Sequence, residues 1–156
     1  MRRAIPVSGP VLVSACLAGR ECTYQGTDRA NEVVIRLVAE GRAVLVCPEE
    51  EAGLGTPRPE AEIQSGSGED VLDDATGVKT IDGVDVTDEY LDGARIAVER
   101  AQATGCAAAI LKARSPACGC GQVYDGTFEG RRRDGDGVAA AALRRHGVEL
   151  FTDEEI

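Results

Sequence analysis

The sequence has no tryptophan, and aromatic residues make up only 3% of its 156 positions. Its hydrophobic core must therefore be built from valine, leucine, isoleucine and alanine. Apolar residues still account for 43% of the chain, which is typical of a globular protein and excludes a disordered one. A chain of this length can form one core without disulfide bonds, and we expect a single domain over residues 1–156.

Long continuous hydrophobic runs are also missing, and no segment is long enough to span a membrane. The segment that ends at Cys16 is similar to a bacterial lipoprotein signal, but Pro6 and Pro10 interrupt the apolar stretch that such a signal needs. We therefore interpret Val11–Ala15 as the first core strand, and we expect a cytoplasmic protein.

Positive charge is scarce, since the formal net charge is −10. A surface of this kind repels nucleic acids and anionic membranes unless a local basic patch overrides it. One short basic run is present, Arg131–Arg133, and the overall charge favours a solvated loop there over a binding patch. We therefore expect no nucleic-acid partner and no membrane partner. The oligomeric state stays open.

Six cysteines would suit a disulfide framework in a small secreted protein. This chain is longer than the usual disulfide-dense scaffold, and its predicted strands and helices suffice for a core. Several of the cysteines also follow strands, inside turns that are rich in glycine and proline. Such positions suit metal or catalytic chemistry better than disulfide bonds.

Short apolar runs alternate with amphipathic segments along the chain. Buried strands are predicted at Val11–Ala15, Ala43–Val46, Ala107–Leu111 and Val148–Phe151, and helices at Ala30–Val38, Thr87–Ala101 and Gly137–Arg145. A hairpin is predicted at Val78–Asp85, and a long functional loop at Glu49–Ser67. This order indicates an α/β fold: a single-domain, Rossmann-like parallel sheet flanked by helices, with a small hairpin insertion.

Three cysteines follow the predicted strands. Cys16 and Cys47 come directly after the first and second strands, and Cys118 lies a few residues after the third. In open parallel sheets, ligands bind beyond the carboxyl ends of the strands. We therefore expect these three thiols to converge at one edge of the sheet.

A shared thiolate site is favoured over three unrelated thiols, although no C-x-x-C pair is present. Three thiolates leave one position open, whether on zinc or on one iron of a [4Fe–4S] cluster. Ligation by sulfur alone favours the iron–sulfur cluster. The only histidine, His146, lies near the end of the last predicted helix, where we expect it to cap carbonyl groups.

Two other residues belong to the same predicted edge. Glu49 follows Cys47 by two positions, and Ser115 precedes Cys118 by three. A carboxylate there can move protons, and a hydroxyl can orient a water or a carbonyl. The alternatives are an exposed acid in an acidic loop and a turn residue before Pro116. The residues alone do not decide between these roles.

Four blocks of sequence, in order, carry a resemblance to a known family. They are Ser14–Gly19 with Cys22–Gly26; Cys47–Glu49 with Gly53–Pro59 and Ala61–Ile63; Asp85–Thr87 with Gly93–Ala94; and Ile110–Lys112 with Ser115–Gly119 and Tyr124–Phe128. They span the chain from about Val11 to Phe151. Together they resemble the thiouracil desulfidases, bacterial iron–sulfur proteins formerly catalogued as a domain of unknown function.

The resemblance implies a [4Fe–4S] cluster held by Cys16, Cys47 and Cys118, with Glu49 and Ser115 as catalytic residues. It implies a non-redox reaction in which the open iron takes the sulfur of a thiopyrimidine, water replaces that sulfur, and sulfide leaves. The alternatives are desulfuration of thiouridine in tRNA and a non-catalytic protein that binds sulfide or metal.

The remaining cysteines are interpreted separately. Cys106 is expected to be a buried structural residue, and Cys22 is favoured as a neighbour of the site over a ligand. Cys120 is a departure from the family, and we expect it to point away from Cys118 because only Gly119 separates the two. A second departure is Ala117, where the family usually has serine, so that we expect one hydroxyl near the cluster to be missing.

Overall fold

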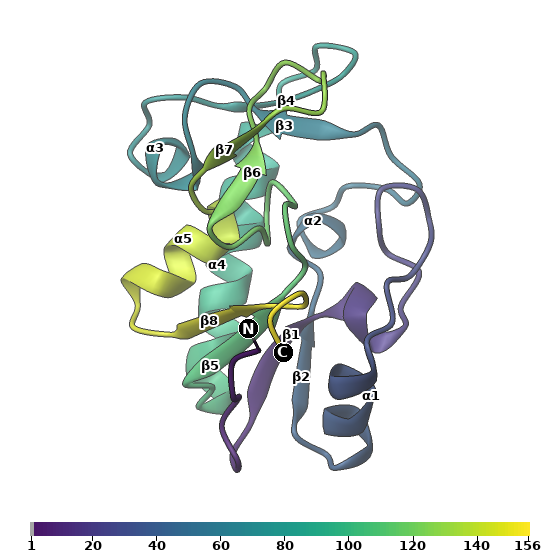
Figure 1. Cartoon of the computed structure of the whole chain (residues 1–156). Helices are drawn as coiled ribbons and strands as arrows, with labels where there is room; N and C mark the ends of the chain where they lie inside the picture. Colours follow the sequence, from purple (N-terminus) through teal and green to yellow (C-terminus); the bar gives the residue numbers. More distant parts are fainter. Residues whose placement is uncertain (1) are drawn as a thin grey trace.

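A four-stranded parallel sheet forms the centre of the computed structural model, which describes residues 2–156 (Figure 1). Its strands lie in the order β2 (Ala43–Val46), β1 (Val11–Ser14), β5 (Ala108–Leu111) and β8 (Glu149–Thr152). Val13 of β1 pairs with Leu45 on one side and with Ile110 on the other. The predicted α/β fold with a parallel sheet and flanking helices is confirmed.

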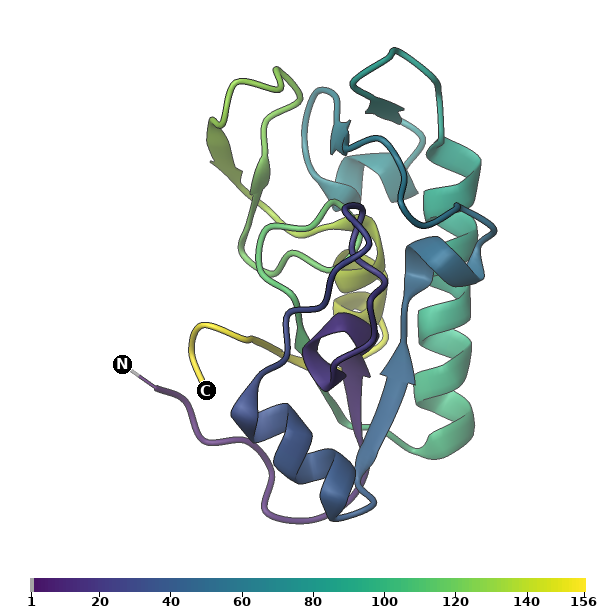
Figure 2. The same cartoon turned by 90° about the vertical axis from the view of Figure 1, so that its right-hand side faces the viewer.

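Helices cover both faces of the sheet (Figure 2). On one face, α1 (Glu32–Ala39) packs its Val34 and Leu37 with the apolar residues of the strands. On the other face lie α4 (Thr87–Thr104) and α5 (Val138–Arg145). Because both faces are covered, the central strands are continuous apolar runs rather than alternating ones.

The core contains few aromatic rings, as the composition predicts. Its largest fully buried side chains are Phe151 and a set of leucine, isoleucine and valine residues. Both helices of the second face contribute buried alanines to the core, among them Ala97 and Ala101 on α4 and Ala139 and Ala140 on α5. Small side chains allow these helices to approach each other closely.

The longest helix, α4, begins and ends close to the predicted positions. Thr87 is its first residue rather than its cap, and the Thr87 hydroxyl oxygen accepts a hydrogen bond from the Val78 amide instead. Gly105 ends the helix in the left-handed conformation, with φ of 73°, which glycine adopts without strain. Among residues 2–156, no helix has the length and apolar character needed to cross a membrane.

Two small antiparallel sheets lie beyond the carboxyl ends of the parallel strands, at the top of Figure 1. One joins β3 (Ala61–Ile63) to β4 (Val78–Thr80), and the other joins β6 (Gln122–Tyr124) to β7 (Arg132–Asp134). Three short helical segments complete the fold: η1 (Ala15–Ala18), α2 (Pro48–Glu51) and α3 (Gly68–Leu72).

The predictions for the connecting segments are partly wrong. The predicted loop Glu49–Ser67 contains most of α2 and the whole of β3. The predicted hairpin at Val78–Asp85 is present, since Lys79 and Asp85 form an antiparallel bridge and the amides of Thr80 and Val86 donate to the carbonyls of Val84 and Val78. Its first strand, β4, also pairs with β3. Elements of three to five residues carry too few apolar positions to show a periodic pattern, so pairing with distant segments decides them.

Candidate functional site

A cavity of about 420 Å³ opens at the carboxyl ends of the parallel strands. It lies where the strand order reverses between β1 and β5, which is the place where open α/β sheets bind ligands. Five residues singled out in the sequence line this cavity: Cys16, Cys47, Cys118, Glu49 and Ser115. The fold thus brings residues that are up to about a hundred positions apart in the sequence to the wall of one cavity.

Each of the three thiols is held by a turn that follows its strand. Cys16 lies in η1, which ends at Gly19 with φ of 100°. Cys47 precedes α2, and its amide donates to the Glu51 carboxylate at 3.0 Å. Cys118 follows β5 by several residues, and its amide donates to the hydroxyl oxygen of Ser115 at 3.0 Å.

The three thiols are 5–8% exposed, so they are nearly buried where they meet the cavity. Burial raises the pKa of Cys16 to about 11, and burial also raises the pKa of Cys118. The pKa of Cys47 is lowered, first of all by a hydrogen bond with Cys22. The buried thiols of Cys16 and Cys118 therefore ionise more readily when a cation binds them.

This donor set fits an iron–sulfur cluster. Within residues 2–156, no three side chains of histidine, cysteine, aspartate or glutamate converge on a point where a single metal ion would be held. The thiols of Cys16, Cys47 and Cys118 instead line a shared cavity. A cubane cluster binds one thiolate at each of several separate iron atoms, so its ligands need not meet at one point.

Cys22 lies beside Cys47 in the same wall. Its side chain is 2% exposed, and its carbonyl oxygen lies 3.8 Å from the Cys47 sulfur. The same carbonyl accepts a hydrogen bond of 2.9 Å from Arg58. A side-chain hydrogen bond with Cys47, together with burial, raises the pKa of the Cys22 thiol.

Glu49 is held in the cavity wall rather than in solvent, since its side chain is only 14% exposed. Its Oε2 atom accepts a hydrogen bond of 2.7 Å from the Tyr90 hydroxyl and one of 3.2 Å from Arg58. Neither bond uses Oε1. The carboxylate is therefore fixed through one oxygen, while the other remains available to a ligand.

The Tyr90 phenol comes from α4 and is 3% exposed. Burial, together with the neighbouring Glu49 carboxylate, raises the pKa of Tyr90 well above its usual value. Tyr90 therefore stays protonated and acts as a donor to Glu49. Tyr90 and Arg58 are not among the site residues predicted from the sequence.

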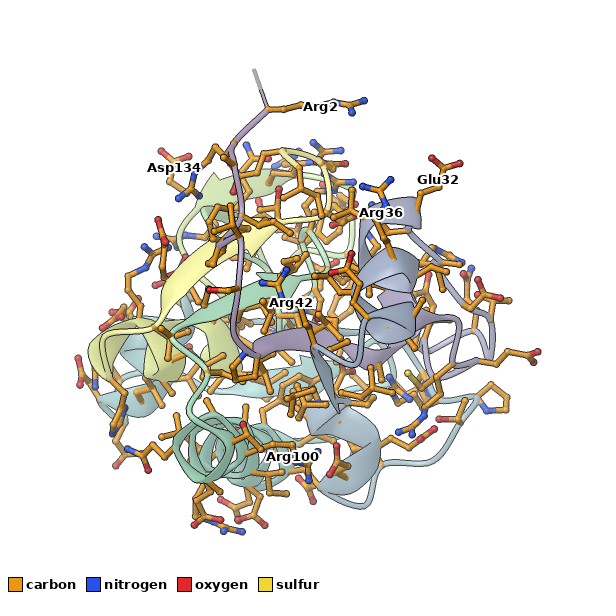
Figure 3. All side chains as sticks on the ribbon, turned by 90° about the horizontal axis from the view of Figure 1, so that it is seen from below. Arg2, Glu32, Arg36, Arg42, Arg100 and Asp134 are labelled. Atoms are coloured by element: carbon orange, nitrogen blue, oxygen red, sulfur yellow. The ribbon has the colours of Figure 1, made fainter. Side chains whose placement is uncertain are left out.

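Contacts between α2 and α4 fix the position of Cys47 and Glu49. Arg100 of α4 forms an ion pair with Glu51, and it also donates to the Leu45 carbonyl at 3.0 Å. Figure 3 shows Arg100 on the side of α4 that faces α2. At Gly93, a side-chain carbon would lie 2.5 Å from the Pro48 carbonyl oxygen, so this approach requires glycine.

Ser115 serves both as a turn residue and as part of the cavity wall. Its hydroxyl oxygen accepts hydrogen bonds from the amides of Ala117 and Cys118, at 3.1 and 3.0 Å. Because both of these bonds end on the oxygen, the hydroxyl proton remains free to be donated into the cavity. The turn thus presents one hydrogen-bond donor beside Cys118.

The two departures from the family do not alter the cavity wall. Cys120 is not a lining residue, and its sulfur accepts a hydrogen bond of 3.3 Å from Arg144. Ala117 packs in the core with 1% exposure, and it does not line the cavity either. The expectation that a serine hydroxyl is missing near the cluster at this position stays a prediction.

Cys106 and His146, whose structural roles were predicted from the sequence, lie outside the cavity. Cys106 is buried in the core, where its sulfur lies 3.2 Å from the Thr104 hydroxyl. His146 ends α5, and its Nδ1 lies 2.9 Å from the Ala142 carbonyl oxygen. The predicted capping role of the histidine is confirmed.

Aromatic side chains are concentrated at the cavity. The chain has three tyrosines and two phenylalanines, and four of these five rings line the wall: Tyr24, Tyr90, Tyr124 and Phe128. Most of the aromatic rings of this chain therefore surround one cavity. Such a wall suits a flat, partly apolar ligand.

Comparisons with known proteins agree with this geometry. The model of the 2-thiouracil desulfurase family matches residues 11–155. YbbK of Bacillus subtilis (strain 168), an uncharacterized protein, is 44% identical over 146 residues, which are 94% of this chain and 97% of the relative. A solved structure described as the [4Fe–4S]-dependent thiouracil desulfidase TudS is 40% identical with a TM-score of 0.84, over 96% of this chain and 93% of that one. The chain therefore belongs to the 2-thiouracil desulfurase family.

Proposed function

We propose that this protein removes the sulfur of thiouracil or a related thiopyrimidine and releases the oxo base and sulfide. Cys16, Cys47 and Cys118 would hold a [4Fe–4S] cluster for this reaction. The observation that carries the proposal is the single cavity in which three thiols, the Glu49 carboxylate and four aromatic rings share one wall. The likeness to a [4Fe–4S]-dependent thiouracil desulfidase supports it.

The reaction needs no electrons, since water supplies the oxygen of the product and sulfide carries away the sulfur. When bound, a cluster with three protein thiolates supplies an iron without a protein ligand, which acts as a Lewis acid towards a thiocarbonyl sulfur. Glu49 is placed to move the proton. Its Oε1 is free to take a proton from the attacking water or to return one to the pyrimidine ring, while Tyr90 and Arg58 hold Oε2.

Ser115 and the aromatic rings orient the substrate. The free hydroxyl proton of Ser115 can be donated to the water or to a pyrimidine oxygen. The rings of Tyr24, Tyr124 and Phe128 offer flat surfaces against which a pyrimidine can stack. These groups exclude bulk water from the ring and keep its reactive carbon in line with the attacking water.

A second candidate, desulfuration of thiouridine in tRNA, is favoured by one observation. Arg132 and Arg133 lie in β7, which pairs with β6, and Tyr124 of β6 lines the cavity. The predicted solvated loop is thus a strand, although its residues are exposed as expected. The net charge of −10 still argues against an RNA substrate.

A comparison of free and polymeric substrates tests the proposal. Protein purified without oxygen and loaded with its cluster would be given 2-thiouracil, 4-thiouracil and tRNA that contains 4-thiouridine, with no reductant. We expect sulfide and the oxo base to be released from at least one free thiouracil, and intact tRNA to be a poor substrate. Release from tRNA alone would support the second candidate, and no release from any of the three would contradict the proposed activity.

Replacing Cys120 by serine tests whether the cluster keeps one iron free. The Cys120 sulfur accepts a hydrogen bond from Arg144, and Cys120 does not line the cavity. We therefore expect Cys120→Ser to change iron content and turnover by no more than about twofold. Added sulfide should perturb the cluster absorption of both proteins equally. A response to sulfide that appears only in the Cys120→Ser variant would show that Cys120 ligates the fourth iron.

A further inference from the structure

Glu62 is a buried carboxylate that the proposed reaction does not use. It lies in β3, in one of the small sheets beyond the carboxyl ends of the parallel strands (Figure 1). The residue is only 8% exposed, yet it lines the same cavity as the three thiols. Glutamates are rarely buried to this extent unless their oxygens have partners, so each oxygen needs to be accounted for.

One oxygen of Glu62 fastens a loop of the cavity wall. Its Oε1 accepts hydrogen bonds from the amides of Gly126 and Phe128, at 2.9 and 3.1 Å. Gly126 has φ of 95°, and a side-chain carbon there would lie 2.6 Å from the Ile63 carbonyl oxygen. The loop is therefore seated directly on β3, and this contact places the Phe128 ring in the wall.

The other oxygen of Glu62 is left open to the cavity. Neither of the two hydrogen bonds ends on Oε2. In residues 2–156, no side-chain oxygen is both fully buried and without a partner, so Oε2 must be accessible, and the residue lines the cavity. Four cations line the cavity, and three of them have carboxylate partners, in the pairs Arg58–Glu49, Arg114–Glu154 and Lys112–Asp153. The fourth, Arg29, donates hydrogen bonds to Thr27 and Gln25.

We propose that Oε2 of Glu62 accepts a hydrogen bond from a ring N–H of the pyrimidine, which makes Glu62 a specificity-determining residue. This inference rests on the proposed function. Uracil and thiouracil carry N–H groups next to their carbonyl or thiocarbonyl carbons, and a carboxylate can only accept hydrogen bonds. The site would therefore select pyrimidines that present an N–H and reject those in which that nitrogen is alkylated.

The variant Glu62→Gln separates substrate recognition from support of the loop. The amide oxygen of glutamine can still accept from Gly126 and Phe128, while its amide nitrogen replaces Oε2 by a donor. Binding of uracil to the cluster-loaded protein would be measured by calorimetry, because uracil has no sulfur to be removed. We expect the dissociation constant of uracil to rise roughly tenfold to hundredfold, since a hydrogen bond to a charged group is lost.

Methylated uracils identify the hydrogen bond itself. In the wild type, either 1-methyluracil or 3-methyluracil should bind more weakly than uracil by a similar factor, because one of them lacks the donor that Glu62 accepts from. In Glu62→Gln this difference should disappear. A methyl group that weakens binding equally in both proteins would indicate a steric clash and would overturn the inference.

Glu129→Gln is the matched control. Glu129 lies on the same loop, its side chain is 60% exposed and paired with Arg131, and it does not line the cavity. This variant removes the same charge and should leave uracil binding unchanged. Equal weakening in both variants would reveal a general charge effect and overturn the inference.

The two proposals fail in different ways. If Glu62→Gln binds uracil like the wild type, while Glu62→Ala binds it weakly, Glu62 only supports the loop and the inference is wrong. Even if the inference about Glu62 is wrong, sulfide release from thiouracil by the wild-type protein would still support the proposed function. Wild-type protein that releases none would contradict the proposed function, whatever the binding data show.

Discussion

Alanine at any one of Cys16, Cys47 and Cys118 will remove most of the iron and acid-labile sulfide from protein purified without oxygen. The three thiols come from three separate turns and line one cavity. When one of them is removed, the two that remain cannot take its place. Wild-type protein should be brown, and each variant should be nearly colourless. Iron and sulfide analysis together with the visible absorption spectrum measures the effect.

Cys106→Ala is the control for this set, because Cys106 is a buried cysteine that packs in the core away from the cavity. It should keep the full cluster content, although it leaves a small void. Cys22→Ser should also keep most of the iron if Cys22 is only a hydrogen-bonding neighbour of Cys47. Zinc in place of iron in colourless wild-type protein prepared without oxygen would overturn the cluster assignment.

The convergence of the three cysteines could be predicted because it depends on topology alone. The runs at Val11–Ser14, Ala43–Val46 and Ala108–Leu111 are continuous and apolar, which is what a sheet covered on both faces requires. Once these strands are known to be parallel, their carboxyl ends must lie at one edge. The register and the side-chain packing were not needed for this conclusion.

The partners of Glu49 could not be predicted in the same way, because they reach it from distant segments. Tyr90 did leave a signal: with Ala94, Ala97 and Ala101 it forms the buried stripe of α4, and a buried tyrosine hydroxyl needs a partner. Arg58 lies in an irregular segment, where no periodic pattern indicates which way its side chain points.

The burial of Glu62 at the cavity could not be predicted from the sequence either. A glutamate between Ala61 and Ile63 in a three-residue strand gives no indication of whether it faces solvent or a cavity. Its burial depends on the loop at Gly126, more than sixty positions away, which folds onto β3. Contacts of this kind are set by tertiary packing rather than by local propensity.

Glu49→Gln should retain the cluster and lose turnover of thiouracil by about a hundredfold to ten-thousandfold, which is the usual size of a catalytic proton transfer. Glutamine keeps the shape of the side chain and an oxygen that can accept from Tyr90, so the wall around Cys47 should stay in place. Sulfide release under saturating substrate, beside the cluster absorption spectrum, measures the two effects separately. Full turnover with an intact cluster would show that Glu49 moves no proton.

Glu50→Gln is the matched control for the charge. Glu50 is the next acid in α2, its carboxylate accepts a hydrogen bond of 2.8 Å from the Thr56 hydroxyl, and it does not line the cavity. Removal of this charge should leave turnover within about twofold of wild type. A loss as large as that of Glu49→Gln would mean that the acidity of α2 as a whole matters, rather than the one carboxylate in the cavity.

Tyr90→Phe tests whether the orientation of Glu49 matters for its chemistry. Loss of the 2.7 Å hydrogen bond should lower turnover by roughly tenfold, because a hydrogen bond to a charged group contributes about 1.5 kcal/mol or more. If Tyr90 acts through Glu49, the same change made in the Glu49→Gln variant should have almost no further effect, since the group that it positions no longer transfers a proton. A tyrosine that only fills space between α4 and α2 would slow both backgrounds equally, and the two losses would then multiply.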